Sequence, residues 1–121
     1  MHLSAMSLRR AQLLTPMIDV HVISIRSPGN ACAVLPSGFG CVTFVAMSDQ
    51  TAPEPAAIAS IARAARMARD QDVRRLVVHC EMGVSRSVGA ARGIAAAFGL
   101  PFDSEFPGSS LVLAAVAKEL A

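Results

Sequence analysis

The 121-residue sequence contains no tryptophan, no tyrosine and only five phenylalanines, so its core is not built from aromatic side chains. Its apolar content is 53% of the residues and is carried mainly by alanine, valine, isoleucine and leucine, which suits helices packed on a sheet. A chain of this length buries roughly two thirds of the surface that it exposes when unfolded. We therefore predict a single domain, residues 1–121, with one core that needs no disulfide.

Further absences limit the partners and the compartment. No apolar run approaches the roughly 20 residues that cross a bilayer, and no long apolar stretch follows Arg9 and Arg10 as it would in a signal peptide. The net charge of +2 is too small to suggest nucleic-acid binding. Three cysteines at irregular positions are typical of a reducing compartment, which predicts a cytoplasmic protein. We expect no membrane, nucleic-acid, metal or cofactor partner, and infer no oligomeric state.

The most informative segment, Val77 to Ser87, reads VVHCEMGVSRS. Its apolar start predicts a strand that delivers Cys80 to its end, and Arg86 follows after five residues where a helix is expected. A loop of this size that opens into a helix points successive backbone N–H groups and the positive helix end at one tetrahedral anion. Arg86 can hold two oxygens of that anion through its guanidinium fork. The same donors favour the thiolate of Cys80, a nucleophile that can attack phosphorus.

The pattern His79-Cys80-x5-Arg86-Ser87, with Gly83 inside the loop, resembles the signature of the cysteine-dependent protein tyrosine and dual-specificity phosphatases. It is most similar to the small dual-specificity branch of that superfamily. The resemblance implies that Cys80 carries a phosphocysteine intermediate and that Arg86 binds the phosphoryl group. It also implies that His79 orients the loop and that Ser87 assists the thiolate as it leaves.

The resemblance covers the chain from Val20 to Phe98 and identifies a phosphate-binding loop. Gly83 is expected to supply a positive φ angle in this tight loop. Glu81 is expected to place a negative charge at the rim of the site. The loop residues assigned to substrate binding are Glu81, Met82, Gly83, Val84, Ser85 and Arg86.

A phosphatase of this kind needs a second group, because the leaving oxygen must be protonated as the P–O bond breaks. In the family this group is an aspartate on a separate, upstream loop. Asp49 lies 31 residues before Cys80, in a loop at residues 47–53 that follows a predicted strand. We therefore assign Asp49 as the general acid; its alternative role is an Asx turn or a cap for the helix that opens near Pro53. The aspartates that are worse placed are Asp19, Asp70, Asp72 and Asp103.

Strand and helix patterns alternate along the chain. The predicted strands are a short edge strand, His2–Met6, and the buried strands Val20–Ile25, Cys41–Ala46 and Arg75–His79. The predicted helices are Ser7–Leu14, Pro55–Asp70, Ser87–Phe98 and Ser109–Leu120. Ser7 and either Ser109 or Ser110 are expected to cap their helices, and Gly89 and Gly93 to allow close helix packing. This order predicts a compact α/β fold like that of the protein tyrosine phosphatases, with a mostly parallel central sheet flanked by helices on both faces. The site then falls at the carboxyl ends of the strands.

The predicted function is that of a phosphoprotein phosphatase that acts on phosphotyrosine or with dual specificity, and its partner is the phosphorylated protein. Two alternatives stay open. A rhodanese-like sulfurtransferase would transfer sulfur to Cys80, although Ser87 and Asp49 argue against it. A catalytically weak phosphate-binding module would need no nucleophile, whereas Cys80, Arg86 and Asp49 are all intact.

Two features of the sequence depart from the larger relatives or stand outside the motif. Those relatives grip phosphotyrosine with an aromatic recognition loop, for which Phe39, Phe44 and Phe102 are the candidates near loops here, with core packing favoured for each. Cys32 and Cys41 could act as redox partners of Cys80, but buried bystanders are the favoured interpretation.

Overall fold

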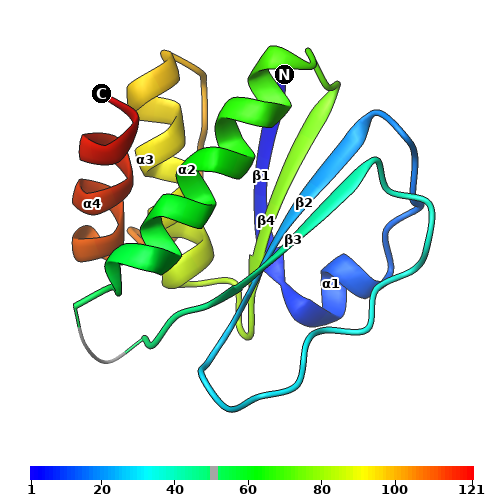
Figure 1. The fold of residues 1–121 in the computed structure, drawn as a ribbon, viewed down its shortest axis with the longest axis horizontal. Coiled ribbons are helices and arrows are strands. Elements are labelled where there is room, and N and C mark those ends of the chain that lie inside the picture. The colour runs from blue at the N-terminus through cyan, green and yellow to red at the C-terminus, as the bar shows by residue number, and fades with distance from the viewer. Residues whose placement is uncertain (50–51) are drawn as a thin grey trace.

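The computed structural model of the protein describes residues 1–49 and 52–121 (Figure 1). Gln50 and Thr51, which belong to the loop predicted to carry the general acid, lie outside the described residues. Within the described part, four parallel strands form one sheet in the order β1-β4-β2-β3. The strands are β1 (His2–Ser7), β2 (Val20–Arg26), β3 (Cys41–Ala46) and β4 (Arg75–Cys80). The predicted α/β class with a helix-flanked parallel sheet is confirmed, and β1 is an edge strand as expected.

The helices are α1 (Leu8–Gln12), α2 (Pro55–Asp70), α3 (Arg86–Phe98) and α4 (Ser110–Leu120). Figure 1 shows α2, α3 and α4 on one side of the sheet and the short α1 on the other. The expected caps are present, because the hydroxyls of Ser7 and Ser109 each accept a backbone N–H from the first turn of their helix. The prediction of a helix to Leu14 was wrong: α1 ends at Gln12, where the Leu13 amide bonds to the Arg10 carbonyl in a tightened last turn.

Successive side chains of each strand point to opposite faces of the sheet, so the core is divided between the two faces. In β4, Leu76, Val78 and Cys80 belong to the larger apolar cluster under α2, α3 and α4, whereas Val77 belongs to a smaller cluster under α1. None of the described helices combines the length and the apolar character that a bilayer crossing requires.

Close contact between α3 and α4 depends on two glycines of α3. A Cβ atom added at Gly89 would lie 2.6 Å from the Ser109 carbonyl oxygen, and one at Gly93 would lie 2.8 Å from the Leu113 carbonyl oxygen. These distances are shorter than ordinary van der Waals contact, and the atoms in the way are backbone. The expectation that these glycines permit close packing is therefore confirmed.

We predict that Gly93→Ala destabilises the protein by about 1–3 kcal/mol, because the added methyl group forces α4 away from α3. Helix propensity alone predicts the opposite sign, a gain of about 0.5–1 kcal/mol. Urea denaturation of the variant measures the change, with Ala97→Ser at an exposed position of the same helix as control. A stabilised Gly93→Ala variant would show that α4 moves freely.

Candidate active site

The candidate site lies where the carboxyl ends of β2, β3 and β4 meet the start of α3, at the lower end of the sheet in Figure 1. Because all four strands are parallel, the loops that follow them gather at this one end. The segments involved are residues 27–30 after β2, 47–49 after β3 and 81–85 after β4.

Cys80 ends β4 with only 2% of its surface exposed. Its sulfur accepts the backbone N–H of Gly83 at 3.3 Å and lies 3.1 Å from the Ser87 hydroxyl. Gly83 has φ +76°, and a Cβ atom there would lie 2.4 Å from the backbone nitrogen of Ser7. The positive φ predicted for Gly83 is therefore confirmed, and the loop needs glycine both for its conformation and for its packing on the end of β1.

Backbone donors of the loop are left without protein acceptors. The amides of Met82, Val84 and Ser85 form no hydrogen bond with any residue in the ranges 1–49 and 52–121. Ser85 is the N-cap residue of α3, but its hydroxyl makes no cap hydrogen bond and so does not use the backbone N–H groups of the first turn. Free amides at the positive end of a 13-residue helix favour binding of an anion.

Arg86 is the first residue of α3, and its side chain is almost entirely buried. One terminal nitrogen, Nη1, donates to the Ser27 hydroxyl at 3.1 Å and to the Met47 carbonyl at 2.8 Å. Its Nε is buried without a hydrogen-bond partner in the described chain and lies 3.9 Å from Oδ1 of Asp49. Asp49 is 44% exposed, so its carboxyl group is accessible from solvent while it faces Arg86. The structure thus brings Asp49, Arg86 and the Cys80 loop together.

His79 is fully buried and lies on the far side of the strand from the thiol. Its Nδ1 is 3.2 Å from the Cys80 carbonyl, which can only accept, so Nδ1 carries the proton. Burial lowers the pKa of His79, and the hydrogen bond to that carbonyl offsets only part of the effect. Nε2 of the neutral ring therefore accepts a hydrogen bond from the Ser24 hydroxyl, 2.7 Å away. This arrangement holds the backbone of Cys80 and places no ring nitrogen at the sulfur.

Glu81, the first loop residue, is tied to the segment after β2. Its Oε1 accepts from Arg26 Nε at 2.5 Å and from Asn30 Nδ2 at 3.3 Å. Burial alone would raise the pKa of the Glu81 carboxyl, but these hydrogen bonds and the charges of Arg26 and Arg86 outweigh it and lower the pKa. The negative charge expected from Glu81 is therefore paired with Arg26, which neutralises it.

Several residues of this network carry no recognisable motif. Ser27 and Asn30 stand at the two ends of a Ser-Pro-Gly-Asn segment, which is typical of a turn and not of a catalytic site, and the Met47 carbonyl is backbone. Ser24 could have been noticed in the sequence, because it is the single hydroxyl residue in a buried apolar strand. The structure shows that it pairs in register with His79.

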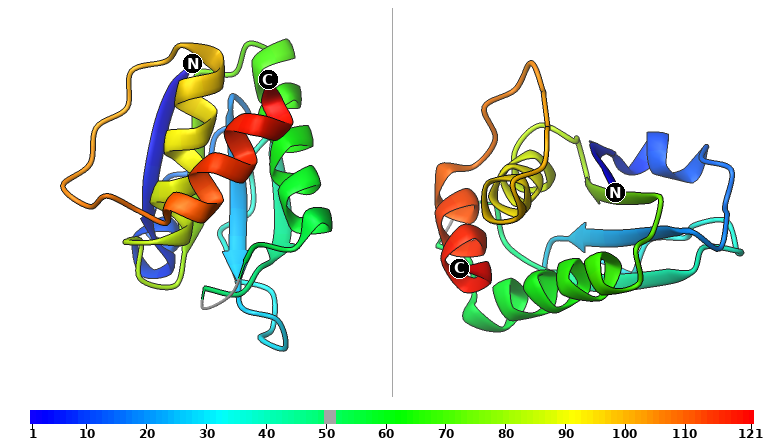
Figure 2. Two further views of the ribbon diagram at one scale, coloured as in Figure 1. Left: turned by 90° about the vertical axis from the view of Figure 1, so that its left-hand side faces the viewer. Right: turned by 90° about the horizontal axis from the view of Figure 1, so that it is seen from above.

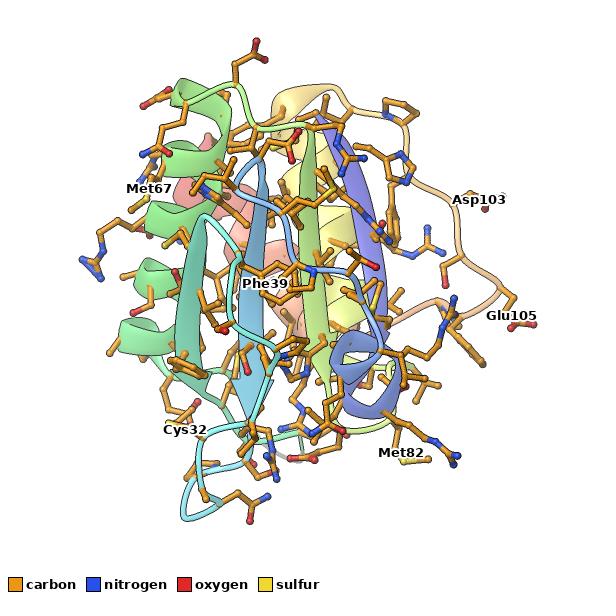
Figure 3. All side chains as sticks on the ribbon, turned by 90° about the vertical axis from the view of Figure 1, so that its right-hand side faces the viewer. Cys32, Phe39, Met67, Met82, Asp103 and Glu105 are labelled. Atoms are coloured by element: carbon orange, nitrogen blue, oxygen red, sulfur yellow. The ribbon has the colours of Figure 1, made fainter. Side chains whose placement is uncertain are left out.

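The other candidate residues differ in their exposure. Met82 and Val84 expose 75% and 39% of their surface and form an apolar rim on the loop; Figure 3 labels Met82. Phe39 and Phe102 pack against the two core clusters as expected, whereas the favoured core assignment of Phe44 was wrong, since it is half exposed on β3.

The two other cysteines are both free. Cys41 begins β3 at the opposite end of the sheet from Cys80, which removes it as a direct partner of that thiol. Cys32 is exposed, so the prediction of a buried bystander was wrong for this residue.

No protein-family model matches this chain, and neither does any curated protein.

We predict that Glu81→Gln lowers thermal stability at pH 7, by about 1 kcal/mol, because a neutral amide replaces the charge-assisted acceptor of Arg26. The Glu81 pKa is lowered by folding, so its contribution is present above the unfolded value of 4.5 and is lost as pH falls through the folded value. The difference in Tm between wild type and variant should thus be smaller at an acidic pH, below 4.5, than at pH 7. Thermal denaturation at both pH values measures this, with the exposed Glu119→Gln as control. A difference that is constant with pH would contradict the charged contact.

Proposed function

We propose that this protein is a cytoplasmic phosphoprotein phosphatase that hydrolyses phosphotyrosine, or phosphotyrosine and phosphothreonine, through a phosphocysteine intermediate on Cys80. The observation that carries the proposal is the buried Nε of Arg86, which has no acceptor in the described chain and lies beside both Asp49 and the Cys80 loop. A buried charged donor without a partner is costly, and a phosphoryl oxygen would supply the missing acceptor.

In the first step the Cys80 thiolate attacks phosphorus, so that an S–P bond forms as the ester P–O bond breaks. The free amides of the loop and Arg86 bind the phosphoryl oxygens, whose charge they stabilise throughout. The leaving oxygen takes the proton of the Asp49 carboxyl group and departs as an alcohol or a phenol.

In the second step a water molecule gives a proton to the Asp49 carboxylate while the oxygen of the water attacks phosphorus. The S–P bond breaks, and the sulfur leaves as a thiolate that accepts hydrogen bonds from the Ser87 hydroxyl and the Gly83 amide. Inorganic phosphate is released, and the cycle has consumed only the ester and water.

The resemblance of the loop to the small dual-specificity phosphatases supports a protein substrate. The free thiols of Cys32, Cys41 and Cys80 support a reducing compartment. The positioning of His79 through Ser24 supports its assignment as a residue that orients the loop.

We predict that Cys80→Ser abolishes turnover but keeps oxyanion binding, because the amides and Arg86 survive while the nucleophile is lost. A panel of phosphotyrosine, phosphothreonine and phosphoinositide substrates measures turnover of wild type and variant. Vanadate or phosphate should still raise the Tm of the variant.

Hydrolysis by Cys80→Ser at a rate near that of wild type would contradict the covalent mechanism. Thiosulfate turnover by a wild type that hydrolyses no phosphate ester would instead identify a sulfurtransferase. Phosphate binding without either reaction would identify a binding module.

We predict that Asp49→Asn lowers kcat by roughly 10²–10⁴-fold, the usual contribution of a positioned general acid. The kcat for aryl phosphates should fall least, because an acidic phenol needs little protonation as it leaves. The kcat for phosphothreonine should fall most. Steady-state kinetics on a series of leaving groups measures this, with the exposed Asp72→Asn as control. A small loss that is uniform across leaving groups would show that Asp49 only shapes its loop.

A further inference from the structure

The outer edge of β1 is an open strand edge. In the described chain β1 pairs only with β4, and residues 99–109 run along its other side, as Figures 2 and 3 show. No backbone hydrogen bond joins this loop to β1 within the described residues. The loop is held instead by α3, because Arg92 donates to the carbonyls of Ser104 and Phe106 at 3.0 and 2.8 Å. The strand and the loop therefore stand apart, each anchored separately.

The space between them is a groove that leads to the phosphate loop. It consists of two hollows of about 640 and 380 Å³ that share lining residues from β1, α1 and the loop. The shared residues are Ala5, Met6, Arg10, Asp103 and Ser104. The larger hollow extends to His2 and Arg75, and the smaller one ends at Met82, Gly83 and Val84. A ligand that lies in the groove thus touches the rim of the candidate active site.

The edge itself favours pairing with another extended chain. β1 reads HLSAMS, without the lysine, glutamate or proline that usually protects an open edge. Six residues at about 3.3 Å each give an edge of roughly 20 Å, which suits a short peptide that adds as a strand.

The charged residues that line the groove indicate which kind of peptide it binds. Arg10 and Arg75 line the strand side of the groove, and neither forms an ion pair within the described residues. Arg75 is partly buried and donates to the Ser4 hydroxyl at 3.0 Å, and the charges of Arg74 and Arg10 lie near it. Asp103 and Glu105 line the opposite side, on the loop. An acidic peptide side chain that points towards Arg10 and Arg75 would relieve their mutual repulsion.

We propose that the polypeptide flanking the phosphorylated residue binds in this groove as an added strand beside β1, with an acidic side chain on Arg10 and Arg75. This inference rests on the proposed phosphatase function and specifies its substrate class: an extended, acidic phosphopeptide segment in place of a small phosphate ester.

The first test compares substrates on the wild-type protein. One substrate is a small aryl phosphate, and the other four are forms of one phosphotyrosine peptide. The first form has acidic residues on both sides of the phosphotyrosine, and the second has glutamines in their place. The third and fourth are the acidic peptide N-methylated at its odd-numbered or at its even-numbered amides. Losing one main-chain hydrogen bond should lower kcat/KM about 3–10-fold, and neutral flanks should lower it by a similar factor. Because a strand pairs through every second amide, only one of the two N-methylation phases should be harmful. Equal kcat/KM for all four peptide forms would overturn the proposal.

The second test uses a matched pair of variants on α1. Arg10→Glu reverses a charge in the groove, and Arg9→Glu makes the same change on the same helix at an exposed residue that lines neither hollow. The ratio of kcat/KM for the acidic peptide to that for the aryl phosphate should fall about 3–10-fold in Arg10→Glu only. Equal ratios in the two variants would refute the groove. If Arg10→Glu fails to fold, the substrate series on wild type still decides.

A separate measurement distinguishes failure of the groove from failure of the proposed function. Hydrolysis of the aryl phosphate reports on the catalytic site alone, and its absence would refute the phosphatase. Fluorescence anisotropy of labelled peptides with Cys80→Ser reports on the groove without turnover. Acidic flanks should strengthen peptide binding to this variant, and one N-methylation phase should weaken it; an unchanged affinity would refute the inference even if the enzyme is active.

Discussion

The buried guanidinium of Arg86 is the interaction on which the rest of the site depends. A charge that leaves water must find polar partners, and here the partners come from two other loops: the Ser27 hydroxyl after β2 and the Met47 carbonyl after β3. Arg86 therefore holds together three segments that are distant in sequence. Within the described residues Nε of the same side chain has no acceptor and lies beside Asp49, so the side chain that stabilises the loops also presents a donor to an incoming oxyanion.

Arg86 is held in place by the packing of α3. The carbonyl of Ser85 accepts the amides of both Gly89 and Ser109, which joins the start of α3 to the start of α4. This junction is possible because Gly89 and Gly108 lack side chains: a Cβ atom at either would meet backbone atoms at 2.6 Å. On the other side, Gly83 packs on the end of β1. The loop is thus fixed by contacts that only glycine allows, while the amides of Met82, Val84 and Ser85 have no partner in the described chain and can bind a ligand.

The sequence predicted the parts of this architecture that depend on local pattern. Strand and helix positions followed from apolar periodicity, and the spacing of Cys80 and Arg86 placed both at one strand-to-helix turn. The resemblance to the phosphatase signature pointed to Asp49, which lies 31 residues before Cys80 in a loop that follows a predicted strand. The contacts of Glu81 with Arg26 and Asn30 could not be predicted, because they join residues more than fifty positions apart through side-chain geometry. The extent of α1 was also missed, since its last turn tightens where residues 13 and 14 still suit a helix.

Alternation along two strands explains how the nucleophile is oriented. His79 and Glu81 flank Cys80 in the chain, and they bond to Ser24 and Arg26, which flank Ile25 on β2. Side chains two residues apart share a face, so both polar pairs lie on one side of the sheet and the thiol must point to the other. On that side Cys80 belongs to the cluster under α3, where Ser87 meets the sulfur. A Cys-x5-Arg loop on its own would not fix this direction; the polar residues of β2 supply the constraint.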